Sequence, residues 1–189
     1  MKDQLHNYLN RYVIFSEEEM NILFKLFEYR TFPKKEHLLV QDELCKYQFF
    51  ITEGLVRSYY IDEKGDERIT QFAIENWWVT NLDSYKNLSP SALFIQAIEK
   101  TTVLRISKEN LELAFESIPK LERAFRIITE NMLVAIQKRY EFYQKKSSKE
   151  RYQQMIAALP DFSQRVPQYM IASYLEISPE YLSSLRKDI

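Results

Sequence analysis

The sequence predicts an α+β protein with a strand-rich front domain, a long helix and a small helical C-terminal domain. Short aromatic and β-branched segments fill residues 30–106, and such residues suit a half-buried pleated surface. An uninterrupted helical pattern then runs from 120 to 151, with apolar residues spaced by threes and fours. Two short helical patterns separated by a turn end the chain. The strand-rich part should close as a sandwich or barrel.

Composition narrows the class of protein. The chain has 189 residues, of which 46% are hydrophobic and 28% charged, as expected for a folded globular protein. The single cysteine, Cys45, excludes an intrachain disulfide and a four-cysteine metal or iron–sulfur site within one chain. With only two histidines, we expect no metal and no cofactor. No apolar run approaches the roughly 18 residues of a membrane span, and no signal core opens the chain, so we expect a cytoplasmic protein without membrane contact.

Charge is distributed unevenly along the chain. Residues 1–118 carry 14 Lys and Arg against 19 Asp and Glu, which gives −5, whereas residues 119–189 carry 12 against 8, which gives +4. A basic rear fits contact with a polyanion such as nucleic acid, although basic ends are often only solvated.

The front of the chain has clear boundary signals. Ser16 is a favourable N-cap, and the three glutamates after it suit the first turn of a helix. Gly54 and Gly65 lie in turns between strand segments, where a positive φ is needed. Ser107 is expected to cap the next helix. The predicted strands span 37–41, 48–52, 55–61, 68–74, 77–82, 93–98 and 102–106.

The long helical pattern after Pro119 carries an apolar stripe. A helix of about 25 residues is roughly 38 Å long, which is as long as a small domain is wide. The stripe fits either a core helix of one domain or a parallel dimer seam. We favour the dimer because the stripe extends beyond what the preceding strands could cover. The predicted dimer residues are Leu121, Phe125, Ile128, Met132 and Ile136.

The last pattern, residues 167–187, predicts a helix-turn-helix. Pro167 opens the first helix, and Ser178 with Pro179 opens the second. The small Ala172 suits the crossing point of the two helices. Glu176 occupies the turn position with positive φ, where a residue other than Gly costs about 1 kcal/mol. The alternative is an αα-hairpin without DNA-binding function.

The second of these helices would enter the major groove by its N-terminal half. Glu180 can accept a hydrogen bond from a cytosine amino group. The hydroxyls of Ser183 and Ser184 can hydrogen-bond to more than one kind of base. The predicted base contacts are Pro179, Glu180, Ser183 and Ser184. The predicted phosphate contacts, each equally explained as a solvated charge, are Lys145, Lys146, Lys149, Arg165, Arg186 and Lys187.

The whole chain resembles the Crp/Fnr regulators. The residues that carry the resemblance are 49–60 with their strand-Gly-strand pattern, the hairpin 62–67, Ala97 with 103–106, and the helix-turn-helix at 166–186. The resemblance implies a double-stranded, jelly-roll-like β-roll of the cyclic-nucleotide-binding type, and a parallel homodimer. The implied domains are a sensor at 1–117, a dimerisation helix at 118–145 and a DNA-binding domain at 146–189. The family's wing hairpin would then be absent or truncated.

The ligand site of the family does not carry over. Cyclic-nucleotide binders have a Gly-Glu pair that this chain lacks within 76–85, and an arginine where this chain has Ser91. The adenine-contacting Thr-Ser pair aligns with Ile136 and Gln137. A buried phosphate without its arginine loses its charge partner, so we expect neither cAMP nor cGMP to bind. A pocket for another small-molecule effector, or simply core, would comprise Trp78, Thr80, Tyr85, Ser91 and Phe94.

These observations predict a homodimeric, DNA-binding transcriptional regulator with an unidentified effector. Its partners would be double-stranded DNA, a second copy of itself and, by the resemblance, RNA polymerase. The alternative is a ligand-sensing or protein-interaction module whose helix-turn-helix no longer binds DNA. An enzyme is disfavoured because we find no catalytic triad pattern and no phosphate-binding Gly loop.

Overall fold

The computed structural model describes residues 1–159 and 161–187, and contacts divide the chain into two compact units. The front unit comprises Met1–Ser58 and Phe72–Asn131, and the rear unit comprises Tyr59–Gln71 and Met132–Ile189. The predicted α+β class is confirmed, with antiparallel strands first, then a long helix and C-terminal helices. A short hairpin segment, residues 59–71, groups with the rear helices.

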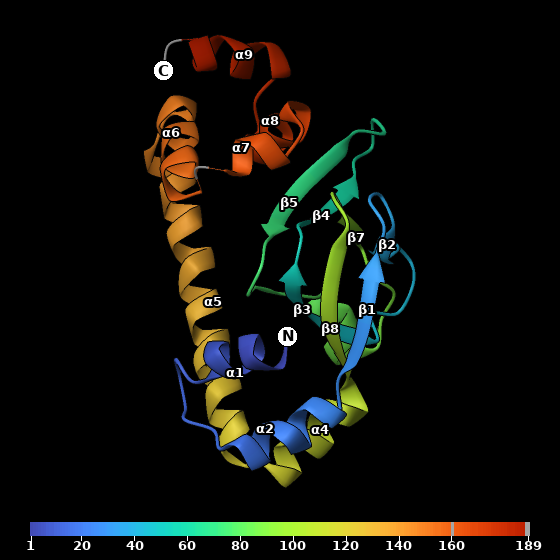
Figure 1. Ribbon diagram of the computed structural model, residues 1–189. Coiled ribbons are helices and arrows are strands. Elements are labelled where there is room, and N and C mark those ends of the chain that lie inside the picture. Colours follow the sequence, from blue (N-terminus) through green and yellow to red (C-terminus); the bar gives the residue numbers. More distant parts are fainter. Residues whose placement is uncertain (160, 188–189) are drawn as a thin grey trace. The chain divides into compact units, whose positions relative to one another are not determined.

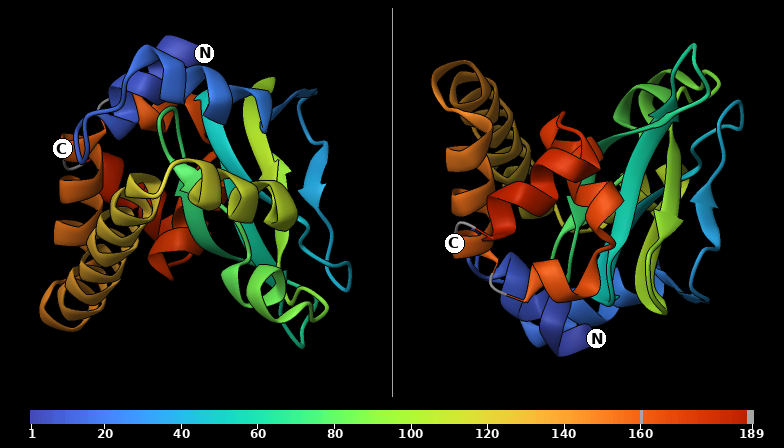
Figure 2. Two further views of the ribbon diagram at one scale, coloured as in Figure 1. Left: turned by 90° about the horizontal axis from the view of Figure 1, so that it is seen from below. Right: turned by 90° about the horizontal axis from the view of Figure 1, so that it is seen from above.

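Two four-stranded sheets form the strand-rich part (Figure 1). The first has the order β1(Glu28–Phe32), β8(Thr101–Ser107), β3(Tyr47–Glu53) and β6(Trp78–Val79). The second has the order β2(His37–Leu39), β7(Phe94–Ala97), β4(Val56–Ile61) and β5(Glu67–Ala73). β8 pairs with both β1 and β3 in antiparallel register, and Figure 2 shows these three strands side by side.

Alternation along β3 separates two cores. Phe49 and Ile51 belong to the core between the sheets, whereas Phe50, between them in sequence, belongs to a second core on the other face. This follows from the two-residue period of a strand. The core between the sheets collects side chains from both of them: Phe32, Leu39, Phe49, Ile51, Val56, Ile95, Ala97, Val103 and Ile106.

Four helices supply the second core of the front unit. They are α1(Lys2–Leu9), α2(Glu17–Lys25), α4(Lys108–Ser117) and the first turns of α5(Lys120–Lys145). Their buried side chains cover Phe50 and Leu104 of the first sheet. Ser107 caps α4 through a hydrogen bond from Asn110 N, as the sequence predicted.

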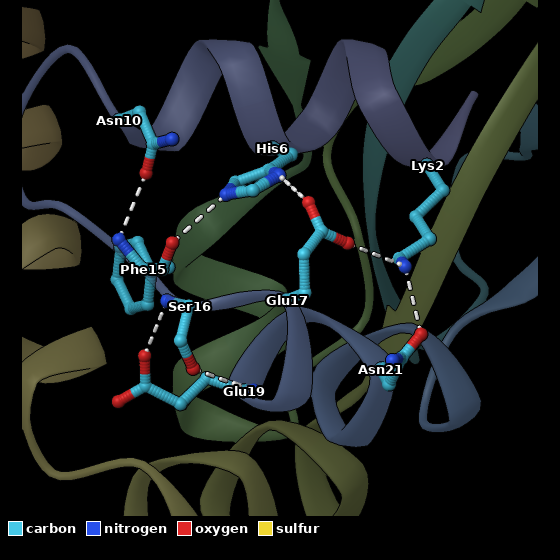
Figure 3. Close-up of polar contacts among 8 residues, drawn as sticks. All are labelled: Lys2, His6, Asn10, Phe15, Ser16, Glu17, Glu19 and Asn21. Carbon is cyan, nitrogen blue, oxygen red and sulfur yellow. Dashed lines mark hydrogen bonds and ion pairs between the residues drawn. The ribbon is translucent and has the colours of Figure 1, made fainter.

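The connection from α1 to α2 is held by polar contacts (Figure 3). Ser16 caps α2 in a capping box with Glu19, which confirms the predicted cap. His6 Nε2 lies 2.9 Å from the Phe15 carbonyl oxygen, and its Nδ1 lies 3.3 Å from Glu17. The Lys2 ammonium at 3.1 Å is the main reason why the pKa of Glu17 is lowered.

One predicted strand is wrong. Residues 77–82 form only the two-residue β6, and the chain then enters α3(Leu82–Asn87). The Asn81 side chain accepts a hydrogen bond from Ser84 N and so starts a helix where the sequence suggested extended backbone. Two tryptophans and a valine in succession dominated the sequence pattern and concealed this cap.

The rear unit is helical apart from residues 59–71. After α5 come α6(Ser148–Ala158), α7(Phe162–Arg165), α8(Gln168–Leu175) and α9(Pro179–Lys187). α5 ends at the predicted junction, where Ser147 and Glu150 form a second capping box. Lys146 and Ser147 hold the pKa of Glu150 at about 2. From the sequence we expect Pro160 to end the helix that follows the junction, and this residue lies outside the described ones.

The turn between α8 and α9 has the strained geometry that the sequence predicted. Glu176 has φ +57° and ψ +42°, which is left-handed. Its N–H donates to the carbonyl oxygens of Ala172 and Ser173, and Ile177 N donates to Ala172 O at 3.0 Å. These bonds satisfy carbonyls at the end of α8, so the turn keeps its shape despite the cost of the side chain.

We predict that Glu176→Gly raises the free energy of unfolding of the rear unit by about 0.5 to 1 kcal/mol, because Gly adopts a positive φ without steric cost. Thermal melting followed by circular dichroism measures the effect. The same substitution at exposed Gln153 within α6 should instead destabilise by about 1 kcal/mol. Destabilisation by Glu176→Gly would contradict the relief of strain.

Candidate nucleic-acid interface and sensor cassette

The helix-turn-helix is built around a small apolar core in the rear unit. Ala172 is only 1% exposed, which allows α8 and α9 to approach closely. The side chains that surround it are buried on both helices: Ile171, Leu175, Leu182 and Leu185. Because Leu182 and Leu185 face inward, the opposite face of α9 is turned away from the core.

All four predicted base-contact residues lie on exposed positions at or near the start of α9: Pro179, Glu180, Ser183 and Ser184. Ser178 caps the helix, since its Oγ accepts a hydrogen bond from Tyr181 N at 3.2 Å. The pKa of Glu180 is lowered by its own backbone N–H and by the Ser178 hydroxyl, so the carboxylate is ionised at neutral pH. α9 therefore presents one carboxylate and two hydroxyls.

Two exposed tyrosines of the helix-turn-helix were not among the predicted DNA contacts. Tyr181 in α9 is 48% exposed, and Tyr169 in α8 is 54% exposed. Tyrosines are common in helix cores, so their type gave no signal. The alternation of buried Leu182 and exposed Glu180 around Tyr181 could have indicated an outward flank.

The predicted phosphate contacts fall into three groups. Arg186 and Lys187 are exposed in the last turn of α9. Lys145 lies 3.5 Å from Glu141, and Lys146 lies 2.9 Å from Glu150, so both lysines have an acidic neighbour one helical turn away. The remaining two residues are half-buried, in α6 and at the end of α7: Lys149 and Arg165.

The predicted dimer stripe divides along α5. Leu121 is fully buried in the front unit, and Phe125 packs there against Trp78 with ring centres 5.3 Å apart. Ile128 packs against the same core. Met132 and Ile136, in the rear unit, are instead 43% and 57% exposed.

A different set of apolar residues is exposed at helical spacing on α5. Leu133, Ile136 and Tyr140 are 54%, 57% and 67% exposed, and they are separated by three and four residues. We call these three residues the exposed α5 seam. Of these three, only Ile136 belongs to the predicted dimer residues, because Leu133 and Tyr140 lie outside the spacing of the predicted stripe.

We call the segment around α3 the sensor cassette (residues 81–91). Several of its side chains hydrogen-bond to one another and to neighbouring backbone, whereas the buried Tyr85 hydroxyl and Ser89 Oγ make no hydrogen bond within the part of the chain that the structure describes. Ser91, where the resemblance implies an arginine, is 1% exposed; it accepts from Asn81 Nδ2 and donates to Leu93 O, both at 2.8 Å. Ser84 Oγ donates to Ser89 O and accepts from Cys45 N. The only basic residue of the cassette is Lys86, which is exposed.

The five residues of the predicted effector pocket lie in different surroundings. Trp78 faces the aromatic core near α5, and Phe94 contacts His37. Thr80 donates to Tyr47 O, whereas burial raises the pKa of Tyr85 to about 12. A cavity of about 390 Å³ opens beside β2 and β3, and its lining includes none of the five: Leu38, Leu39, Glu43, Leu44, Cys45, Lys46, Tyr47, Phe49 and Arg105.

Residues 1–159 and 161–187 contain neither a metal-binding cluster nor a membrane-spanning helix. No group of three or more His, Cys, Asp or Glu side chains in these ranges could hold a metal ion. No helix among them is long and apolar enough to cross a membrane.

Residues 29–117 match the family model of the cyclic nucleotide-binding domain. The front of the chain is thus a domain of this class, followed by a long helix and a helix-turn-helix. Electron transport regulator A of Shewanella oneidensis is 27% identical over 167 residues, covering 82% of this chain and 66% of that protein. The fumarate and nitrate reduction regulatory protein of Vibrio cholerae is 28% identical over 152 residues, covering 79% and 60%. The matches thus span less than two thirds of these relatives.

Solved structures agree with this assignment. FixK2 from Bradyrhizobium japonicum has a TM-score of 0.73 at 19% identity, with 86% of this chain and 83% of that one covered, which shows a shared fold. The family model, the relatives and this shared fold all support the similarity to Crp/Fnr regulators. The resemblance noted in the sequence is confirmed. The relatives are named as regulators, which agrees with a non-enzymatic role.

Proposed function

We propose that the chain is a homodimeric, DNA-binding transcriptional regulator. In this proposal α9 enters the major groove, two copies pair along the exposed α5 seam, and the sensor responds to a ligand other than a cyclic nucleotide. The observation that carries the proposal is the outward face of α9: it is exposed, polar and capped, on a helix-turn-helix whose core is complete.

The side chains of α9 can contact bases, but they distinguish few base pairs. An ionised Glu180 accepts from the amino group of cytosine and repels phosphate, so it favours the groove floor over the backbone. Arg186 and Lys187, at the other end of the helix, can contact phosphates. One copy offers few charges, and two copies double the number of phosphates engaged.

Pairing of two copies follows from the exposed α5 seam. Side chains spaced by three and four residues on a continuous helix form the contact line of a coiled coil. Burying apolar area contributes about 25 cal/mol per Å², and Leu133 and Ile136 are both more than half exposed in the single chain. A parallel pair would present two copies of α9 to successive turns of the same DNA face.

The sensor cassette argues against a cyclic phosphate. Ser91 Oγ already has three hydrogen-bond partners, since it also accepts from Leu93 N at 3.1 Å. A phosphate placed there would have to break these bonds and would gain no guanidinium in return. We therefore propose that the effector has different chemistry and binds without this phosphate contact.

We predict that the chain binds duplexes selected from a random library, with an affinity that falls as salt rises. Lys187→Gln should weaken binding to all sequences and reduce the salt slope by about 1, because one phosphate contact is lost. Lys34→Gln, which removes an exposed charge from the front unit, is the control. Fluorescence anisotropy at two salt concentrations measures both. Absence of binding even at low salt would favour the interaction-module alternative.

Dimerisation should depend on the exposed α5 seam. We predict that the wild-type chain has twice the monomer mass of 22.8 kDa by light scattering, and that Leu133→Asp converts it to monomer because a carboxylate would be buried at the interface. Asn131→Asp introduces the same charge at another exposed position of α5 and should leave the dimer intact. A monomeric wild type, or equal effects of both variants, would refute the seam.

Calorimetric titration tests the sensor. We expect no heat of binding with cAMP or cGMP, since the cassette lacks a cation at Ser91. Micromolar affinity for either nucleotide would show that the cassette rearranges to accept the phosphate.

A further inference from the structure

A stack of alternating rings and guanidinium groups links three helices of the rear unit. Arg139 Cζ of α5 lies 4.2 Å from the ring centre of Tyr174 of α8 and 5.4 Å from that of Tyr143 of α5. Arg151 Cζ of α6 lies 4.4 Å from the same Tyr143 ring. All three distances are within the range of cation–π attraction. We call these four residues the arginine–tyrosine stack.

Hydrogen bonds fix the stack to the backbone. Arg139 Nη1 donates to Thr70 O at 2.5 Å, so the guanidinium joins β5 to α5 and α8. The Tyr143 hydroxyl donates to the carbonyl oxygen of Tyr174 in α8. Arg151 Nη2 donates to Ser148 Oγ at 2.9 Å within the first turns of α6.

The residue beside Tyr174 reinforces the same attachment. Ser173 Oγ accepts from Ile69 N at 3.1 Å and donates to Glu67 O at 2.8 Å. The Ser173 hydroxyl is thus hydrogen-bonded to one N–H group and one carbonyl group of the β5 backbone. Two adjacent residues of α8 are thus attached: Ser173 to the β5 backbone, and Tyr174 to Arg139, which is itself bonded to β5.

The stack also crosses the break between α5 and α6, at Lys146 and Ser147. Tyr143 precedes the break and Arg151 follows it. Since α9 packs on α8 across Ala172 through a three-residue turn, any constraint on α8 is transmitted to the recognition helix.

We propose that Arg139 is a positioning residue for DNA binding: it sets the orientation of the helix-turn-helix relative to the end of α5, and thereby the half-site separation that a dimer accepts. This inference rests on the proposed function. Arg139 is half-buried between two rings and bonded to Thr70 O, so its charge is engaged within the chain. The outward face of α9 stays exposed in this arrangement.

The test uses the full chain and duplexes that carry two inverted copies of the half-site recovered by selection. The half-site centres are placed from about 9 to about 12 base pairs apart, around the helical repeat. Wild type is compared with Arg139→Gln, and with Lys138→Gln, which removes one cation from the next, exposed position of α5. Affinities are measured at two salt concentrations, and thermal melting verifies that each variant is folded.

We expect wild type and Lys138→Gln to prefer one separation sharply. Arg139→Gln should lose roughly fivefold to tenfold at that separation, keep the wild-type salt slope and bind the other separations nearly as well, because the orientation of α8 is no longer fixed. Arg139→Lys, which keeps the charge but not the planar group, should lie between the two.

Three results would overturn the role. An unchanged separation profile in folded Arg139→Gln would make the stack purely structural. An equal loss at all separations with a salt slope reduced by about 1 would make Arg139 a phosphate contact. Tighter binding by Arg139→Gln would mean that the stack restrains the protein in an incompetent state. Failure of the proposed function is recognised separately, since the selection would then recover no half-site for wild type and the positioning role would fall with it.

Discussion

The length of α5 is the constraint on which the rest of this protein depends. Its 26 residues extend beyond the front unit, which buries Leu121 and covers Phe125 but leaves the apolar side chains further along exposed. Leu133, Ile136 and Tyr140 are each more than half in water. A continuous exposed apolar line of this kind is stable when another surface covers it. A second α5 is a surface of matching length and chemistry, and it would place two helix-turn-helix ends at one face of DNA.

A single copy of α9 offers few contacts to DNA, and pairing of two chains would compensate for this. α9 offers one carboxylate, two hydroxyls and two basic residues, which is modest for a single DNA-binding unit. Linking two such units makes the second binding event intramolecular and multiplies the affinity. The orientation of each unit then matters as much as its contacts, and the arginine–tyrosine stack supplies a rigid connection in the rear unit. In the sensor cassette of the front unit, Asn81, Ser84 and Ser91 engage one another and nearby backbone through hydrogen bonds.

Features set by local chemistry could be predicted from the sequence. Ser16 and Ser107 cap helices, and Glu176 has the expected positive φ, because each depends on a few neighbouring residues. Features set by packing could not. The 3.6-residue period predicts an apolar stripe on α5, and only the tertiary fold determines how far along the helix the front unit covers it. α3 depends on the Asn81 cap, which two tryptophans obscured. The residues predicted for an effector pocket have separate packing partners: Trp78 packs on the aromatic rings of Phe50 and Phe125, whereas Thr80 donates to Tyr47 O, and these long-range contacts leave no local signal in the sequence.

Cross-linking at position 133 tests the central claim most directly. In a parallel two-fold dimer along the exposed α5 seam, residue 133 meets its own copy at a distance that a disulfide can span. Leu133→Cys should therefore form a covalent dimer under mild oxidation and still bind DNA, whereas Asn131→Cys should stay uncross-linked. Native Cys45 is 2% exposed and serves as the internal background. Equal cross-linking at both positions, or none at position 133, would contradict the parallel pairing of α5.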